Sequence, residues 1–317
     1  MPRIPRLLVK GEEAYYHVIS RTALEGMVLK DTDKEVLLNL LKWLAKVYFV
    51  EIYGFCIMGN HFHLVVKMLP QSYFSDDEVI ARMKHYFKNL VIKKDTNTER
   101  IEDYREKFSS LSDFIKELKQ RFSRYYNKKH QRRGYFWGER FKSVLLEEGP
   151  ALLNCLAYIE LNPVRAGLTK RPEEYRWTSL AYRLYHGNHD GFLKKDLSVL
   201  GFASEKESIE QLAAFREYVY EKGGLIVPDS ACIPQEIIED ERRRKFRLSR
   251  RRLYLGKIRY FSDSGVLGSK AFVIHHYNKF KGFFRSKKKR PISVPGIDGV
   301  YSLKRFIDKN EWATVRQ

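Results

Sequence analysis

The stretch IMGNHFHLVV, from Ile57 to Val66, contains the features that decide the fold. Gly59-Asn60 is a two-residue turn of the kind that joins antiparallel strands. It lies between two runs rich in β-branched and aromatic residues, 50–58 and 61–67, which predict the two strands of a hairpin. Side chains alternate between the faces of a strand, so His61 and His63 share one face and Phe62 points to the other.

The elements around this hairpin predict the fold class. A β-rich run at 15–20 precedes it, and leucines at helical spacing after a capping box at Thr32–Glu35 predict a helix over 32–48. After the hairpin the patterns predict helices over 76–94 and 111–126, a strand over 141–146 and a helix over 151–161. This order predicts an α+β fold: a ferredoxin-like split βαβ palm, with an antiparallel sheet, helices on one face and one additional helix.

Length and composition predict two domains. The chain has 317 residues, of which 44% are hydrophobic, enough for a sizeable core. The palm is expected over 1–185, with a charged helical insertion over 97–134. Residues 186–317 are expected to form a mostly helical, strongly basic accessory region, with helices over 205–222, 234–252 and 269–280.

Positive charge is concentrated at the end of the chain. Residues 241–317 hold 22 Lys and Arg against 5 Asp and Glu, which accounts for +17 of the net charge of +20. Basic clusters interleaved with aromatic residues favour a nucleic acid partner, although a solvated face or a membrane surface would also accept such charge. No apolar run approaches the roughly 20 residues of a membrane span, and no signal peptide is visible. Cys56, Cys155 and Cys232 are expected to be free thiols in the cytoplasm.

The two histidines after the turn are candidate metal ligands. Two imidazoles on one strand face can share an ion, but alternating polar residues on a solvent face have the same pattern. Zinc would usually need more Cys or His ligands. Two histidines with an oxygen donor, water and phosphate suit Mg²⁺ or Mn²⁺.

Two tyrosines are candidate nucleophiles. Tyr158 and Asn162 are four residues apart in NCLAYIELNPVRAG, so one helix face can present a phenol and an amide oxygen together. Tyr126 and His130 have the same spacing in RYYNKKH. A phenol with a pKa near 10 needs activation, which a divalent cation can provide. The spacing alone leaves both tyrosines open.

Four ordered motifs carry a resemblance to a known family: MGNHFHLVV at 58–66, GYFWGERFKS at 134–143, YIELNPVRAGL at 158–168 and PEEYRWTSL at 172–180. Together they closely resemble the REP-associated tyrosine transposases, which are bacterial relatives of the single-tyrosine transposases. The likeness extends over roughly residues 5–185. Compact members of the family end soon after the last two motifs, whereas this chain continues to residue 317.

The resemblance implies an HUH endonuclease with a ferredoxin-like palm. His61 and His63 match the metal-binding histidines, Tyr158 matches the catalytic tyrosine and Asn162 the polar residue that completes the metal site. The family cuts single-stranded DNA near palindromic hairpins, through a 5′-phosphotyrosine intermediate that leaves a free 3′-OH. The resemblance therefore favours Tyr158 over Tyr126.

These expectations define a DNA nicking and rejoining enzyme that uses Mg²⁺ or Mn²⁺ and acts as a cytoplasmic, nucleoid-associated monomer. The alternatives are a catalytically silent or regulatory hairpin-binding protein and a zinc-supported regulator. Basic residues in the motifs and the tail are expected to contact DNA: Arg140, Lys142, Arg165, Arg250, Arg251, Arg252 and Lys288.

Overall fold

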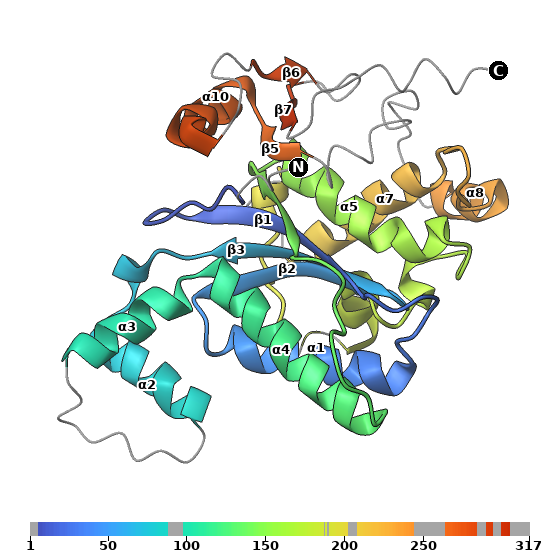
Figure 1. The fold of residues 1–317 in the computed structure, drawn as a ribbon. Coiled ribbons are helices and arrows are strands. Elements are labelled where there is room, and N and C mark those ends of the chain that lie inside the picture. The colour runs from blue at the N-terminus through green and yellow to red at the C-terminus, as the bar shows by residue number, and fades with distance from the viewer. Residues whose placement is uncertain are drawn as a thin grey trace.

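A seven-stranded sheet with helices on both faces organises the part of the chain that the computed structural model describes, residues 6–87, 98–186, 188, 190–201, 208–243, 264–283, 290–293 and 299–304 (Figure 1). The strands are β1 (Ala14–Arg21), β2 (Val50–Ile57), β3 (His61–Met68), β4 (Lys142–Leu146), β5 (Ser264–Gly268), β6 (Ile292–Ser293) and β7 (Tyr301–Lys304). The longer helices are α1 (Asp31–Ala45), α2 (Asp76–Phe87), α3 (Thr98–Phe108), α4 (Leu111–Lys129), α5 (Pro150–Arg165), α7 (Ser208–Gly223), α8 (Gln235–Arg242) and α10 (Lys270–Lys279). Short helical turns are η1 (Gln71–Tyr73), η2 (Pro172–Glu174), α6 (Ser179–Ala181), η3 (Tyr182–His186), η4 (Ser198–Leu200) and η5 (Lys281–Phe283).

The first four strands form the predicted palm. The sheet order is β2-β3-β1-β4-β5-β7-β6, and β1 pairs antiparallel with both β3 and β4. β2 and β3 form the expected hairpin, with the turn at Gly59-Asn60. This order is that of a split βαβ arrangement, so the predicted α+β fold class is confirmed.

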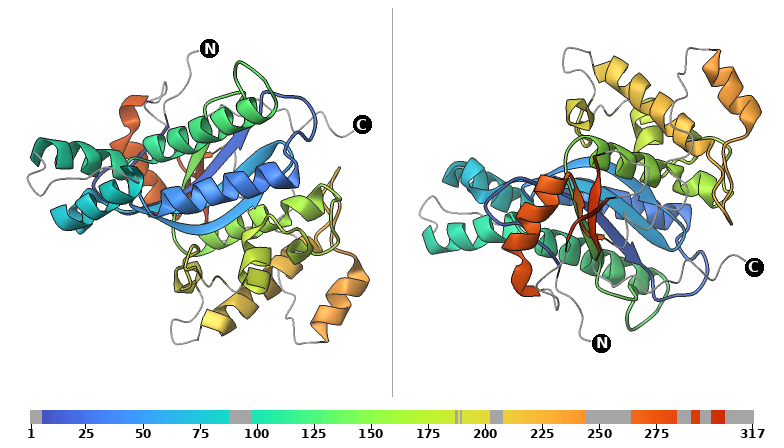
Figure 2. Two further views of the ribbon diagram at one scale, coloured as in Figure 1. Left: turned by 90° about the horizontal axis from the view of Figure 1, so that it is seen from below. Right: turned by 90° about the horizontal axis from the view of Figure 1, so that it is seen from above.

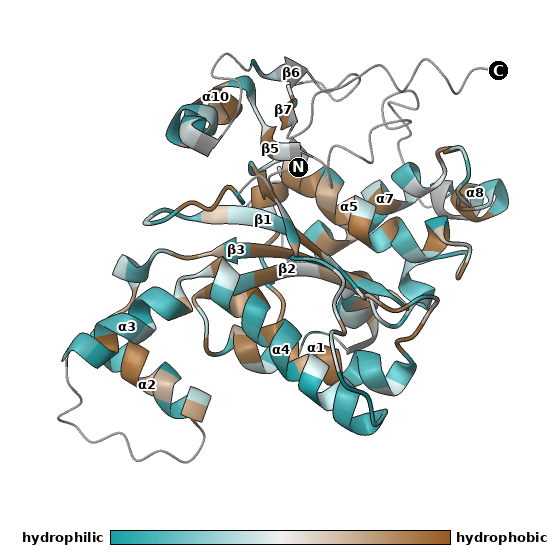
Figure 3. Cartoon of the chain, in the orientation of Figure 1, coloured by the Kyte–Doolittle hydropathy of each residue, from teal (hydrophilic) through white to brown (hydrophobic). Residues whose placement is uncertain are grey.

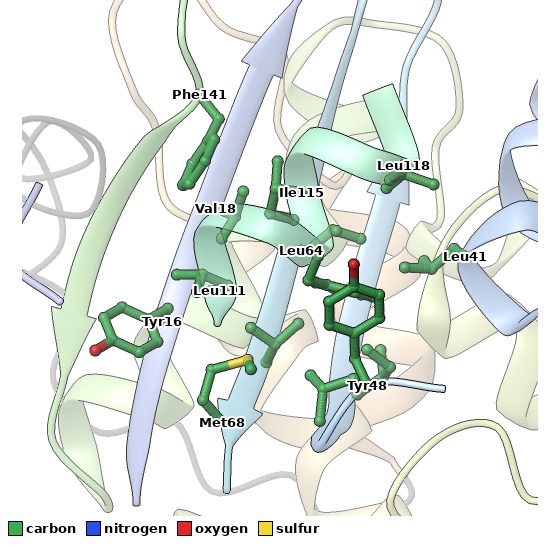
Figure 4. Packing of buried hydrophobic residues seen from close by; sticks show 14 of the residues in the cluster. Tyr16, Val18, Leu41, Tyr48, Leu64, Met68, Leu111, Ile115, Leu118 and Phe141 are labelled. Carbon is green, nitrogen blue, oxygen red and sulfur yellow. The ribbon is translucent and has the colours of Figure 1, made fainter. Parts of the chain in front are cut away.

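One face of the palm is covered by α1 and α4 (Figure 2). Leu111, Ile115 and Leu118 of α4 pack with Val18 of β1 and Leu64 of β3 in a single buried cluster (Figure 4). The charged insertion expected over 97–134 stays a prediction; within that range, α4 packs beside α1 against the sheet. Its many charged residues occupy the solvent face and leave a continuous apolar stripe for the core.

The opposite face is covered by α5 and α7. Leu156 and Ile159 of α5 pack against Val65 of β3 in a second buried cluster, which Val219 of α7 also joins. The expectation of helices on one face thus holds for α1 and α4, while the additional helix lies across the sheet from them. This helix runs to Arg165, beyond the expected end at residue 161.

A close approach between β2 and α5 depends on glycine. A Cβ atom added to Gly54 would lie 2.5 Å from Cδ2 of Leu156 and 3.0 Å from Cδ1 of Ile159. The register of β2 on β3 is irregular at this point, between Ile52 and Gly54. The missing side chain therefore sets how closely α5 can lie on the sheet.

The C-terminal region adds strands that the sequence did not predict. β5 pairs parallel with β4, and its Val266 and Leu267 belong to the two clusters on opposite faces of the sheet. Figure 3 shows hydrophobic residues along β3 and on α5. The bounds of α7 and α10 are close to those of the helices predicted over 205–222 and 269–280. Ser269 caps α10 by accepting a hydrogen bond from the Phe272 N–H. The helix predicted over 234–252 is present as α8, and its basic second half lies outside the described residues. The domain boundary at 185 stays a prediction.

Candidate active site

The two histidines of β3 face α5. Phe62 and Leu64 belong to the cluster under α4, whereas Val65 belongs to the cluster under α5. Because side chains alternate along the strand, His61 and His63 lie on the α5 face, as the sequence predicts. Their ring centroids are 5.0 Å apart, and His63 is buried.

Tyr158 of α5 lies directly across from these histidines. Its ring is 5.5 Å from that of His63, centroid to centroid, in an edge-on arrangement with an interplanar angle of 88°. The same ring is 5.8 Å from that of His17 on β1, at 75°. The structure therefore brings the predicted phenol and the predicted imidazoles into one site, from a helix and two strands.

His17 is the residue that sequence reasoning missed. In the sheet, Ile19 of β1 pairs with His63, and His17 lies on the same face two residues earlier. Its Nε2 shares a hydrogen bond with Nδ1 of His63 at 2.9 Å, and the two rings stack at 5.2 Å. His17 thus supports His63 from the neighbouring strand.

The site favours neutral imidazoles. Burial, with a smaller contribution from the charge of Arg21, lowers the pKa of His61 to about 4. Burial also lowers the pKa of His63, with smaller contributions from His17 and His61. Neutral imidazole is the form that binds metal ions, so both side chains are ready to be ligands at physiological pH.

The donor atoms of the predicted ligands are of types that suit a small divalent cation. His61 Nδ1 bonds to Oδ1 of Asn60 at 2.7 Å, and His63 Nδ1 bonds to His17, so Nε2 is the nitrogen of each ring that can bind an ion. Asn162 donates from Nδ2 to the Tyr158 carbonyl oxygen at 2.9 Å, which leaves Oδ1 as its acceptor. Within the described ranges, no set of three or more His, Cys, Asp or Glu side chains is arranged for a metal. Two nitrogens and a neutral oxygen match the mixed donor set expected for Mg²⁺ or Mn²⁺ better than a closed zinc site.

The rival nucleophile lies elsewhere. Tyr126 of α4 is buried in the cluster on the opposite face of the sheet, where it stacks on His130 with ring centroids 4.1 Å apart. Its hydroxyl donates to the Val28 carbonyl oxygen at 3.4 Å. Tyr126 is therefore a packing residue, and the geometry separates it from the histidine pair.

The predicted DNA-contacting residues fall into three groups. Arg165 donates to the carbonyl oxygens of Lys222, Leu225 and Ala231, so we assign it a structural role that ties α5 to the end of α7. Arg140 and Lys142 are exposed at the start of β4. The other predicted contacts lie outside the described residues: Arg250, Arg251, Arg252 and Lys288.

Together, the palm, the paired histidines and the tyrosine across from them place one phenol and three imidazoles in a single site of an α+β protein. Residues 11–109 match the family model described as "Transposase IS200 like". The resemblance to the single-tyrosine transposases is therefore confirmed over this segment, which contains β1 and the histidine strand but ends before α5. No curated protein matches the chain. A helix long and apolar enough to cross a membrane is absent from the described residues.

One solved structure resembles the chain more broadly. It is described as "Structure of the REP associates tyrosine transposase bound to a REP hairpin". The match has 14% sequence identity and a TM-score of 0.42, and it covers 62% of this chain and 93% of that one.

Proposed function

We propose that this protein is a metal-dependent endonuclease and strand transferase that acts on single-stranded DNA at palindromic hairpins. The observation that carries the proposal is the position of the Tyr158 ring, edge-on to both His63 and His17. The family match over residues 11–109 supports a transposase, and the basic composition supports a DNA substrate.

Tyr158 is the proposed nucleophile. Its phenol gives up a proton as its oxygen attacks the phosphorus of a DNA phosphodiester. The bond from phosphorus to the 3′ oxygen breaks, and this oxygen takes up a proton and leaves as a 3′-OH. The product is a 5′-phosphotyrosine link, which conserves the phosphodiester energy for later rejoining.

His61, His63 and Asn162 are the proposed ligands of Mg²⁺ or Mn²⁺. A bound ion would favour the phenolate form of tyrosine and polarise the scissile phosphate. His17 holds the ring of His63 in place. A proton on Nδ1 of His63, donated to Nε2 of His17, leaves Nε2 of His63 unprotonated and free to bind.

The proposal is tested by covalent capture. A DNA hairpin with single-stranded flanks, labelled at its 3′ end, is incubated with the full chain and Mn²⁺, Mg²⁺ or EDTA. We expect a labelled protein adduct that requires metal and disappears in Tyr158→Phe. Hairpin binding should be retained, because this substitution removes only one oxygen atom. Tyr126→Phe is the matched control and should keep the adduct.

Other results would change the assignment. An adduct that persists in Tyr158→Phe refutes the choice of nucleophile. Hairpin binding by the wild-type chain with no adduct under any metal supports a regulatory hairpin-binding protein. Stoichiometric zinc with no nicking supports the zinc-containing regulator.

A further inference from the structure

A basic groove lies at the edge of the palm, outside the candidate active site. It has a volume of about 580 Å³ and is lined by α4 and by the segment 134–141, which leads from α4 to β4 (Figure 1). Its charged lining residues are Arg6, Lys116, Lys119, Arg124, Arg140 and Glu139, five basic and one acidic. This excess of positive charge suits a polyanion.

Aromatic rings accompany the positive charge. Tyr135 is 89% exposed, so one whole face of its ring is available for stacking. Arg6 lies over the ring of Phe141 at 3.8 Å, and the Lys119 ammonium is 5.6 Å from the ring centroid of Trp137. Burial, with a smaller effect from Arg6, lowers the pKa of Lys119 to about 8, so an anion in the groove would stabilise its charged form. Phe141 and Trp137 are themselves buried, so Tyr135 is the ring of this groove that a base can reach. Cations around an exposed aromatic ring are features that bind single-stranded nucleic acid without base pairing.

The groove is connected to the histidine site through the end of β1. Gly138 N–H donates to the Arg21 carbonyl oxygen at 3.0 Å, and Arg21 pairs with His61 in the sheet. Ile19, the partner of His63, pairs on its other side with Lys142. Residues paired across neighbouring strands share a sheet face, so Lys142 lies on the same face as His63, one strand beyond β1. Arg140 in the groove and Lys142 on this face are two residues apart in the same segment.

We propose that this groove binds the single-stranded segment of DNA that flanks the cleavage site. Tyr135 stacks on a base, and Lys116 and Arg124 contact backbone phosphates. The inference rests on the proposed function in one respect, because it states which part of the DNA substrate the groove receives.

The first test uses an unstructured probe, so it does not depend on hairpin cleavage. Binding of fluorescent dT12 to the full chain is measured by anisotropy. Removing one stacked base contact in Tyr135→Ala should weaken binding by about fivefold or more. Tyr73→Ala, at an exposed tyrosine outside the groove, should leave it unchanged. The variants are exposed at the changed position, and thermal unfolding verifies that they fold alike.

The charge contribution is tested with salt. Each phosphate contact to a single strand adds about 0.7 to the slope of log affinity against log salt concentration. The double variant Lys116→Ala/Arg124→Ala should therefore flatten the slope for dT12 by about 1.4. Lys84→Ala, an exposed lysine of α2 outside the groove, should not flatten it.

The second test connects the groove to the hairpin. Tyr135→Ala should weaken binding of a hairpin with a ten-nucleotide flank and leave a blunt hairpin unaffected. Equal effects on both hairpins, no effect on dT12, or tighter binding of rU12 than of dT12 would overturn the inference. If binding of the single-stranded flank depends on Tyr135 but no covalent adduct forms, the result supports the groove and contradicts the proposed cleavage function. A failure of the groove proposal can therefore be distinguished from a failure of the proposed function.

Discussion

Glu160 lies on α5 two residues after Tyr158 and is a buried carboxyl group whose proton should affect stability. Its side chain is 1% exposed, and Oε1 accepts a hydrogen bond from the Ser179 hydroxyl. Burial is the largest influence and raises the pKa of Glu160 to about 7, although the bond from Ser179 and the charge of Arg183 act in the opposite direction. The folded chain therefore holds this proton more tightly than the unfolded chain does.

The sign and size of the effect follow from linkage. An unfolded glutamate has a pKa of about 4.3, so the folded value lies above it. The bound proton contributes its full stabilisation below the pKa of the unfolded state. This stabilisation is lost as the pH rises toward the pKa of the folded state, and above that pKa the free energy of unfolding no longer changes through Glu160. Between pH 5 and pH 8 the two pKa values give a loss of about 2.5 kcal/mol in the free energy of unfolding.

The measurement compares wild type with Glu160→Gln by urea unfolding at pH 5 and pH 8. Glutamine keeps the shape and has no proton to lose, so the wild-type stability relative to the variant should fall by about 2.5 kcal/mol across this range. His61 and His276, whose lowered pKa values make stability rise with pH, are common to both proteins and cancel in the difference. Glu25→Gln, at an exposed position, should show no such change. A difference between wild type and Glu160→Gln that is flat with pH would refute the reasoning.

Three further outcomes follow from the same geometry. His17→Phe keeps an aromatic ring and loses the hydrogen bond to His63. The Mn²⁺ affinity, measured by electron paramagnetic resonance, should therefore fall roughly 10- to 100-fold, while His85→Phe should not change it. Gly54→Ala forces a methyl group against α5 and should lower the free energy of unfolding by roughly 1–3 kcal/mol in urea, whereas Gly282→Ala, with open space around it, should be nearly neutral. Arg165→Ala leaves carbonyl oxygens without their donor and should lower the free energy of unfolding by roughly 2 kcal/mol or more. The salt dependence of DNA binding should stay unchanged, and a flatter salt slope would restore the predicted role of Arg165 at DNA.

Much of the palm is predictable from local sequence because its signals are local. The hairpin depends on a two-residue turn between two β-rich runs, and α1 on a leucine repeat. The start of α1 differs from the capping box predicted at Thr32–Glu35, because the helix begins at Asp31 and the Asp33 side chain accepts a hydrogen bond from the Lys30 N–H. The face shared by His61 and His63 follows from the period of a strand. The four-residue spacing of Tyr158 and Asn162 indicates one helix face but does not determine what that face meets.

The parts that escaped prediction depend on long-range pairing. His17 enters the site because β1 pairs with β3 in one register, and a shift of one residue would turn it to the other face. The packing of α4 on the palm is hard to predict because its charged residues outnumber its apolar ones, and only the spacing from Leu111 to Phe122 shows the buried stripe. β5 is five residues with a glycine at each of two positions, SGVLG, and only its pairing with β4 makes it a strand.

The position of Tyr158 is set by contacts along its helix and not by the site itself. Gly54 sets the distance of α5 from β2, Glu160 ties the helix to Ser179, and Arg165 ties its last turn to the end of α7. None of these three residues is a proposed metal ligand, yet each limits where the phenol can lie. A reacting group has to be held within a fraction of an ångström of its productive position, so loosening any of these contacts should reduce adduct formation more than hairpin binding. Tyr158 is thus held in register with His63 by packing along the whole of α5, which is why its position could not be read from the spacing of the motif.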